Sequence, residues 1–560
     1  MKNTTKIRKI YDLPIEIILV LFSALIYSLA FPSIISDKGY PIFATFALIP
    51  LIFAVNRTKF KFTPILAIVW GVSFLSIFNY WLSTFHPYAM LLAPILRSIQ
   101  LIVLLPIFKL GYTLPKKHKV IFQASLYTLY TFIMQRGFLA YPYGNLSSAF
   151  ATWLPLIQIV SIAGTWAVSF IMIIPQIFIA NYLIERKTYN FFVFLSDKST
   201  YIIMYSILMA INLVFGIYTI EYYEQIKPSS YKKIAAIQHN SDTWLGGYSQ
   251  YKKNYETMRD LTKEAMKENP DMVMWSETAF VPSVAWHTTY PSNKLTSKLV
   301  SDFVEFGKSL PVPLITGNPE GVLKEGASEP FDSNGNWNRD DYNSVILFSN
   351  GKLIDSYRKQ HLVPFTEYFP YGNIFPKFNK FLISNDFHWW LPGKVSKIFN
   401  YNGIKFSTSI CFEDIFDNIS RSFVKQGSSL LLNVSNDSWS KSVAAEVQHL
   451  DLGIFRSIEN RRSSVRSTNS GITTLILPTG KVVEPIEPFI ADYHIYNTPI
   501  YTKADFGLSF YTRYGNWLIY LFFALDYIYI IARITKVIKF KIDKRNKDKK
   551  HITISTSFDN

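Results

Sequence analysis

The stretch of this 560-residue chain that most suggests chemistry is STSICFEDIF, at residues 407–416. It holds the only cysteine in the sequence, Cys411, with carboxylates close behind it at Glu413 and Asp414. A cysteine thiol becomes a nucleophile when a general base removes its proton. A free cysteine also packs well in protein cores. Cys411 taken alone therefore leaves both catalysis and simple packing open.

Two other segments supply the partners that a cysteine nucleophile needs. VMWSETAF places Glu277 after an apolar run, and SYRKQHLVPFTEYFP carries Lys359 and then Glu367. A carboxylate can accept the thiol proton, and a fixed cation can stabilise the oxyanion of a tetrahedral intermediate. Taken singly, Glu277 could flank a helix N-cap and Lys359 could be a surface charge. Together with Cys411 they form a set suited to nucleophilic acyl transfer.

The region from 229 to 505 that carries these residues reads as an α/β or layered α+β domain, because β-rich runs alternate with helical and polar stretches. The predicted strands lie at 232–240, 271–277, 312–318, 343–350, 404–413, 429–437 and 473–480. The predicted helices lie at 254–269 and 444–459.

Two segments of this region are predicted to be loops. Residues 324–343 are polar and rich in turn residues, which indicates a long loop. Residues 369–393 carry many aromatic side chains without a helical or strand period. This second loop could be buried in the core or could dip into lipid. Its main part, 369–391, is a candidate lid.

Eight apolar segments lie outside this region. They run at about 14–35, 41–55, 63–83, 90–112, 119–137, 153–183, 201–220 and 515–538. Most reach the roughly 20 residues that span a hydrocarbon core. The second is short, and the sixth is long enough to include a re-entrant or interfacial piece. No signal-peptide cleavage pattern follows the first, which predicts a retained helix.

The net charge of +17 is concentrated beside these apolar segments. Lys and Arg precede the first segment, follow the second, fourth and sixth, and form the tail at 536–550. This alternation predicts that both termini are cytoplasmic and that residues 229–505 are outside. It does not favour nucleic-acid binding. Arg97 and Arg136 lie within or near the apolar segments, where they could snorkel to an interface or contact lipid headgroups.

The sequence therefore predicts a multi-pass α-helical membrane domain of about eight helices plus an extracytoplasmic domain. The predicted parts are a transmembrane domain at 1–228, a catalytic domain at 229–505, and a last transmembrane helix with a basic tail at 506–560. One thiol cannot form an intramolecular disulfide. The sequence shows neither a metal-ligand cluster nor a nucleotide-binding loop, so we expect neither a metal nor a cofactor.

The surroundings of the three candidate residues resemble a known superfamily. WSET around Glu277, YRKQHLVPFTEY around Lys359 and ICFED around Cys411 resemble the nitrilase superfamily, whose members use a Glu-Lys-Cys triad on an α-β-β-α sandwich. With seven helices before this domain and one after, nearly the whole chain resembles the apolipoprotein N-acyltransferase family. IQHNSDTW with Trp244, LLLNVSNDSW with Trp439, and RSIENRRSSVRSTNSGIT match as well.

The resemblance implies an activity, substrates and a location. The family moves an acyl chain from a membrane phospholipid to the α-amine of the N-terminal S-diacylglyceryl-cysteine of bacterial apolipoproteins. Cys411 would be the nucleophile that becomes a thioester, Glu277 the general base and Lys359 the cation facing the oxyanion. The protein would be a monomer in the bacterial cytoplasmic (inner) membrane, with its catalytic domain on the periplasmic side.

The resemblance also implies supporting residues. Glu367 would orient Lys359 or the incoming amine, Glu413 matches an acidic position after the nucleophile, and Trp244 matches an aromatic near the lipid or the loops. Phe412 departs from the pattern, because Tyr is expected there. If that hydroxyl helps to form the oxyanion hole, backbone N–H groups must replace it here.

Two other functions compete with this interpretation. A membrane-anchored nitrilase-type amidohydrolase would keep the triad and use water as acceptor, but an anchor needs only one or two helices. A membrane scaffold or lipid-binding protein with an inactive nitrilase domain would be expected to have lost Glu277, Lys359 or Cys411. All three are present.

Overall fold

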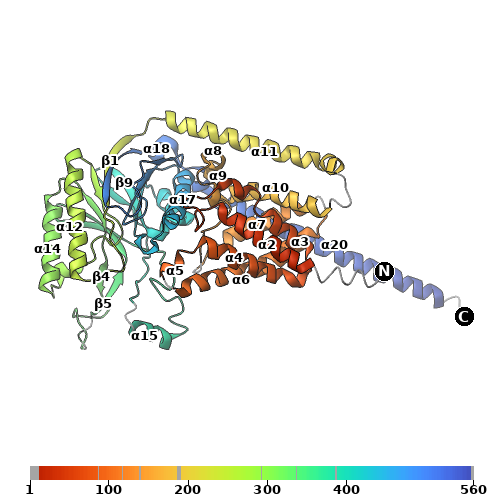
Figure 1. Ribbon diagram of the computed structural model, residues 1–560, viewed down its shortest axis with the longest axis horizontal. Coiled ribbons are helices and arrows are strands. Elements are labelled where there is room, and N and C mark those ends of the chain that lie inside the picture. The colour runs from red at the N-terminus through yellow and green to blue at the C-terminus, as the bar shows by residue number, and fades with distance from the viewer. Residues whose placement is uncertain are drawn as a thin grey trace.

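The computed structural model describes residues 12–556 except 86, 116–117, 138–139, 186–190, 292, 334, 336 and 385–387. A bundle of helices lies beside a layered α/β body (Figure 1). Helix α11 runs along one side of the bundle, and α20 extends away from the α/β body. The chain enters the bundle first, then builds the α/β body, and returns to the bundle at its end.

Each of the eight predicted apolar segments contains a helix. These helices are α2 (Asp12–Leu29), α3 (Ile49–Arg57), α4 (Thr63–Phe78), α6 (Pro87–Tyr112), α7 (Lys119–Ile133), α10 (Thr165–Glu185), α11 (Phe191–Gln225) and α20 (Trp517–Thr556). Short elements connect them: η1 (Pro41–Thr45), η2 (Phe60–Phe62), α5 (Leu82–Phe85), η3 (Ser148–Phe150), α8 (Leu154–Ile157), α9 (Val160–Ala163) and α19 (Phe510–Tyr514). The sixth segment thus divides into α8, α9 and α10, with Gly164 at a positive φ of 69° before α10.

The apolar surface of the bundle suits a membrane. Among the described residues, five helices are long and apolar enough to cross one: Phe60–Phe78, Ala93–Tyr112, Thr165–Glu185, Lys198–Gln225 and Trp517–Lys536. Only 11% of the residues in the apolar windows of the last two helices are buried inside the protein. Continuous apolar surface of this extent is stable against hydrocarbon rather than water, so the prediction of a membrane protein is confirmed.

The α/β body is a sandwich of two six-stranded sheets, with orders β14-β1-β2-β3-β6-β7 and β13-β12-β11-β10-β9-β8. Its strands are β1 (Ser230–Gln238), β2 (Met272–Met274), β3 (Leu314–Gly317), β6 (Ser344–Ser349), β7 (Lys352–Arg358), β8 (Phe399–Tyr401), β9 (Ile404–Ile410), β10 (Leu430–Ser435), β11 (Ser464–Thr468), β12 (Thr474–Ile476), β13 (Val482–Val483) and β14 (Asp492–Ile500). The sheets meet face to face, since Ser467 Oγ on β11 donates to the carbonyl of Ile237 on β1 at 2.9 Å.

Helices cover the outer face of each sheet. The first sheet packs against α12 (Tyr248–Ala265) and α14 (Lys294–Ser309), and the second against α16 (Asp417–Lys425) and α17 (Val443–Asn460). Smaller helices are η4 (Met266–Glu268), α13 (Val284–Thr289), α15 (Pro376–Ser384), η5 (Cys411–Ile415), η6 (Ser438–Ser440) and α18 (Lys503–Phe506). The result is the expected α-β-β-α sandwich. Each range of this region that was predicted to be a strand or a helix overlaps an element of that kind.

The two predicted loops need correction. Residues 324–343 end in β5 (Arg339–Tyr342), which pairs with β4 (Glu320–Leu323) as a separate hairpin. Polar residues can form such a hairpin because it covers no apolar core. Residues 369–393 contain helix α15, and this segment is not buried in the core: Ile374 is 68% exposed and Phe381 is 59% exposed.

Helix α17 joins the α/β body to the bundle. Gln448 Nε2 donates to two backbone carbonyls of the bundle at 2.7 and 3.0 Å, and its Oε1 accepts from Trp81 Nε1 at 3.1 Å. Just beyond the end of α17, Arg461 Nη1 donates to Gln158 Oε1 at 2.6 Å. These contacts are buried, so they fix the orientation of the α/β body on the bundle.

Arg136 and Arg97 turn inward rather than toward lipid, which corrects both interpretations considered for them. The guanidinium of Arg136 donates to both carboxylate oxygens of Asp417 at 2.7 and 3.0 Å. Tyr511 also donates to Asp417, at 2.7 Å. Arg97 is buried, and its Nη2 donates to the carbonyl of Tyr141 at 2.6 Å. The ion pair between Arg136 and Asp417 therefore links the bundle to the α/β body.

We expect Arg136→Gln to destabilise the protein, because Asp417 would remain buried without its cation. Breaking a buried ion pair from one side costs about 3 kcal/mol, and the partial exposure of Arg136 makes about 2 kcal/mol a fair expectation here. Thermal unfolding in detergent, followed by tryptophan fluorescence, measures the loss. The exposed Arg513→Gln is the control, and an equal effect in both variants would contradict the role given to Arg136.

Candidate active site

The three candidate residues come from the ends of three strands. Glu277 follows β2, Lys359 follows β7 and Cys411 follows β9. All three side chains are buried, and Lys359 is only 1% exposed. Lys359 Nζ donates to Glu277 Oε1 at 3.3 Å. The structure thus brings together the acid, the cation and the thiol from three segments spread over more than 130 residues of sequence.

A second carboxylate completes the surroundings of the ammonium. Lys359 Nζ donates to Glu367 Oε1 at 2.9 Å. Asn343 Nδ2 donates to Glu277 at 2.8 Å and to Glu367 at 3.0 Å. Backbone N–H groups hold the other oxygens, with Asn436 N on Glu277 and Val363 N on Glu367. Asn343 could not be recognised from the sequence, because an asparagine just before a strand is equally typical of a turn.

The backbone at Cys411 makes a sharp turn out of β9. Its φ of 50° lies in the left-handed region, which costs a non-glycine residue on the order of 1 kcal/mol. Asn433 Nδ2 donates to the carbonyl of Cys411 at 3.2 Å. The conformation lifts the thiol off the line of the strand at the point where the sheet ends.

Glu413 ties this turn to the segment that carries Lys359. Its carboxylate accepts from Ile410 N at 2.9 Å, Gln360 N at 2.7 Å and His361 N at 3.0 Å. The hydroxyl of Tyr357 also donates to it at 3.0 Å. Burial raises the pKa of Glu413 to about 7, against backbone donors that favour the carboxylate. Glu413 is therefore a fully buried junction between two loops of the site.

Burial and charge set the protonation states of the site. Burial raises the pKa of the Cys411 thiol well above its ordinary value, and the charge of Glu277 adds to this while Lys359 opposes it. Burial alone would lower the pKa of Lys359, but Glu277 and Glu367 hold it well above its usual value. Burial also raises the pKa of Glu277, against the lowering effect of Lys359. The resting site pairs a thiol with a carboxylate and an ammonium.

The aromatic candidates lie around this centre rather than in it. The ring of Phe412 packs on His361 at 5.9 Å and on Phe416 at 4.9 Å. The ring of Trp439 lies 5.3 Å from Trp81 of the bundle. Trp244 is 49% exposed. Phe412 and Trp439 therefore pack against other aromatic rings, whereas about half of the surface of Trp244 faces solvent.

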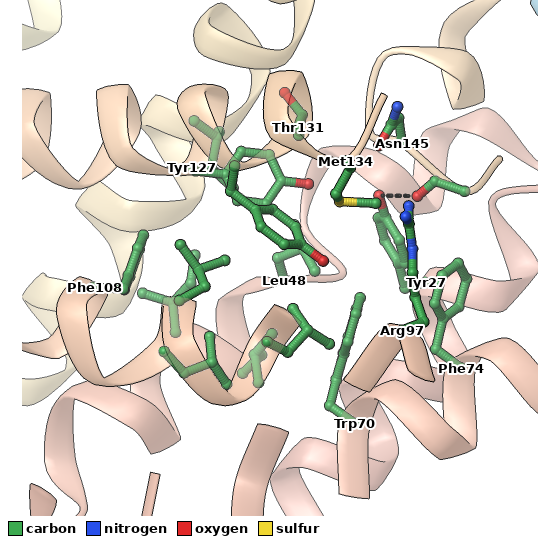
Figure 2. A pocket seen from close by; sticks show the side chains of 18 of the residues that line it. Tyr27, Leu48, Trp70, Phe74, Arg97, Phe108, Tyr127, Thr131, Met134 and Asn145 are labelled. Atoms are coloured by element: carbon green, nitrogen blue, oxygen red, sulfur yellow. Dashed lines mark hydrogen bonds between the residues drawn. The ribbon is translucent and has the colours of Figure 1, made fainter. Parts of the chain in front are cut away.

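The bundle reaches the site through the loop after α7. The phenol of Tyr143 is buried, which raises its pKa, and the charge of Cys411 is among those that raise it further. The same residue lines a cavity of about 50 Å³ among α2, α3, α4, α6 and α7. Figure 2 shows Arg97, Tyr27 and Phe74 on one side of this cavity and Phe108 on the opposite side. Tyr143 therefore lines the apolar cavity of the bundle and lies within electrostatic reach of Cys411.

The segment with α15 is attached directly to the site. Its end is tied to Glu367, just before its start, because Trp390 N donates to the carbonyl of Glu367 at 2.8 Å. Phe375, Phe378 and Phe381 are all more than half exposed. The segment is therefore attached to the site at its base and presents exposed aromatic rings outside the core.

The α-β-β-α fold is nitrilase-like, and two family models match the chain. The model of the carbon-nitrogen hydrolase family matches residues 233–493. The model of the apolipoprotein N-acyltransferase N-terminal domain matches residues 23–177. A solved amidase of the nitrilase superfamily from Nesterenkonia AN1 covers 50% of this chain and 95% of its own, at 16% identity and a TM-score of 0.35.

Relatives that match almost the whole chain identify the family. Apolipoprotein N-acyltransferase 1 of Treponema denticola is 33% identical over 96% of this chain and 98% of its own length. The enzyme of that name from Treponema pallidum is 32% identical over 92% and 95%. Apolipoprotein N-acyltransferase of Borreliella burgdorferi is 32% identical over 85% and 88%. The chain belongs to the apolipoprotein N-acyltransferase family and is an acyltransferase.

We expect Glu413→Gln to loosen the site, because an amide cannot accept from donors on both of its ends. At least one buried backbone N–H would lose its acceptor, which costs about 2 kcal/mol. Thermal unfolding of the purified protein measures this loss. The exposed Glu305→Gln on α14 makes the same chemical change and should have no measurable effect. An unchanged unfolding temperature for Glu413→Gln would contradict the junction described above.

Proposed function

We propose that the protein transfers an acyl chain from a membrane phospholipid, through a thioester on Cys411, to the α-amine of an S-diacylglyceryl-cysteine at the start of an apolipoprotein. The observation that carries this proposal is the buried convergence of Glu277, Lys359 and Cys411 beside a bundle that suits a membrane. Glu277 takes the thiol proton, Cys411 attacks the ester carbonyl, and Lys359 faces the oxyanion.

The site performs two half-reactions in turn. In the first, the thiolate displaces the lysophospholipid, and the proton held by Glu277 goes to the leaving alkoxide. In the second, the amine attacks the thioester, Glu277 accepts its proton, and the thiol is restored. One site that holds first a lipid and then a lipoprotein implies ping-pong kinetics. Phe412 provides no hydroxyl, so we assign the rest of the oxyanion contacts to backbone N–H groups.

The position of the site beside the bundle favours lipid substrates. Extracting an acyl chain into water costs about 0.8 kcal/mol for each CH₂, on the order of 10 kcal/mol for a whole chain. The cavity offers a path that avoids this cost. From Arg97 to Phe108 it follows α6 for about 16 Å at 1.5 Å per residue, which is about half of a hydrocarbon core of roughly 30 Å. We propose that the donor's acyl chain enters this cavity, which must widen to hold the whole chain, with its ester carbonyl at Cys411.

A lid is needed because a thioester in open water would be hydrolysed. The aromatic segment 369–391 is our candidate: it is hinged at Glu367, and its exposed rings suit the lipid surface. We propose that it shields the thioester until the amine arrives. The amidohydrolase alternative needs no such shield, and relatives named N-acyltransferase over nearly the whole chain make it the weaker candidate.

We further propose eight membrane crossings, by α2, by η1 together with α3, and by α4, α6, α7, α10, α11 and α20. The alternation of Lys and Arg between the connecting segments supports cytoplasmic termini and a periplasmic catalytic domain. The end of α11 at Gln225 and the start of β1 at Ser230 support domains at 1–228, 229–505 and 506–560. We propose that the monomer is the working unit, because the site is assembled within one chain.

We expect Cys411→Ala and Glu277→Gln to lower acyl transfer by at least about a thousandfold, as loss of a nucleophile or its base does in other enzymes. The assay follows a labelled acyl chain from phospholipid vesicles to a diacylglyceryl-cysteinyl peptide. The exposed Glu305→Gln should retain full activity. Transfer by Cys411→Ala at the wild-type rate would overturn the proposed chemistry.

The single cysteine allows a clean test of topology. In a Cys411→Ala background the chain has no thiol, so one new cysteine reports on one position. We expect Asp260→Cys on α12 to react with an impermeant maleimide in spheroplasts, whereas Lys59→Cys should react only after the membrane is permeabilised. The opposite pattern would place the catalytic domain in the cytoplasm.

A further inference from the structure

A buried chain of ion pairs lies behind Cys411, and the reaction described above does not use it. His449 Nδ1 contacts Asp437 Oδ1 at 2.9 Å, and His449 Nε2 contacts Asp414 Oδ1 at 2.8 Å. Arg466 pairs with the other oxygen of Asp414. Since both nitrogens of His449 face carboxylates, both must carry protons, and the ring is an imidazolium. Burial would lower the pKa of His449, but the two carboxylates raise it to about 10.

The chain of ion pairs ends, at Asp437, close to the nucleophile. Strands β9 and β10 are parallel and pair Ile410 with Val434, so the next residues, Cys411 and Ser435, are neighbours at the edge of the sheet. Ser435 Oγ donates to Asp437 Oδ1 at 2.9 Å. A hydroxyl has one proton. That proton goes to Asp437 in this structure, although the same hydroxyl is close enough to Cys411 to favour a thiolate if it donated to the sulfur instead.

Two cations packed around Asp437 favour its charged form. The charge of His449 on α17 outweighs burial and holds the pKa of Asp437 below its ordinary value. Arg466 on β11 approaches the second oxygen of Asp437 at 3.9 Å. Glu446 on α17 faces the same space, and burial and the charge of Asp437 raise its pKa well above the usual value. A Cβ at Gly471 would lie 2.7 Å from both acids, which leaves room for glycine alone.

We propose that Asp437 is a positioning residue that keeps Cys411 a neutral thiol in the resting enzyme. It holds the proton of Ser435 away from the sulfur, and its fixed negative charge opposes a thiolate. The thiol therefore loses its proton only when Glu277 accepts it during attack on a bound ester. Until the acyl donor binds, the protonated sulfur therefore reacts slowly with other electrophiles and with oxidants. This inference rests on the proposed role of Cys411 as nucleophile.

The sole cysteine makes the test direct, because a thiol reagent modifies only Cys411. We would measure the alkylation rate of the full-length protein in detergent with iodoacetamide, by intact mass. We expect Asp437→Asn to react roughly tenfold faster near neutral pH, the effect of removing one close negative charge. The matched control is Asp414→Asn, which removes an equally buried carboxylate from the far side of His449. Its rate should change by less than about twofold, because Asp414 does not hold the proton of Ser435 and its charge is paired directly with both His449 and Arg466.

Equal acceleration in both variants would mean that the network had merely loosened, and an unchanged rate in Asp437→Asn would remove the proposed charge effect. Either result overturns the proposal. The wild-type protein provides a measurement that needs no variant to fold. Its alkylation rate should still rise at about pH 9, above the ordinary thiol pKa of about 8.5, and a plateau below that value also overturns the proposal. Because no assay here involves acyl transfer, failure of this inference differs from failure of the proposed function.

Discussion

The ammonium of Lys359, buried between Glu277 and Glu367, is the interaction on which the rest of the site depends. Removing three charges from water costs several kcal/mol for each ion unless hydrogen bonds and opposite charges replace the lost solvent. Asn343 and the backbone N–H groups of separate loops provide that replacement. The loops must therefore hold their positions whether or not a substrate is bound. A preorganised cation facing the thiol is the consequence.

Lipid substrates add a second constraint, because this dry ionic centre must lie where acyl chains can reach it. The structure meets it by docking α17 on the bundle through buried hydrogen bonds and through the pair between Arg136 and Asp417. Tyr143, from the bundle, lies close enough for the charge of Cys411 to affect it. The surroundings of the site therefore come from both parts of the chain, because Tyr143 of the bundle lies near Cys411 and also lines the apolar cavity.

Much of this could be predicted from the sequence, and the failures have physical causes. The predicted strands at 271–277 and 404–413 pointed to Glu277 and Cys411, because buried strands read as apolar runs that stop at polar residues. Lys359 was recognised only from the residues around it, because the strand before it, β7, is largely exposed and was not predicted. The helix at 376–384 was missed because its apolar residues recur at helical spacing over only nine residues. Asn343 and the pairing of Arg136 with Asp417 depend on segments brought together only by the tertiary fold, which single-sequence patterns do not encode.

The central claim is that Cys411 carries the acyl chain between donor and acceptor. Intact-protein mass spectrometry of the purified protein mixed with phospholipid, without acceptor, tests it most directly. If Cys411 forms the thioester, the wild-type protein should gain the mass of one acyl chain. The gain should be absent from Cys411→Ala and should be removed by adding a diacylglyceryl-cysteinyl peptide. Folded wild-type protein that gains no mass, or an adduct that decays equally fast without the peptide, would contradict it.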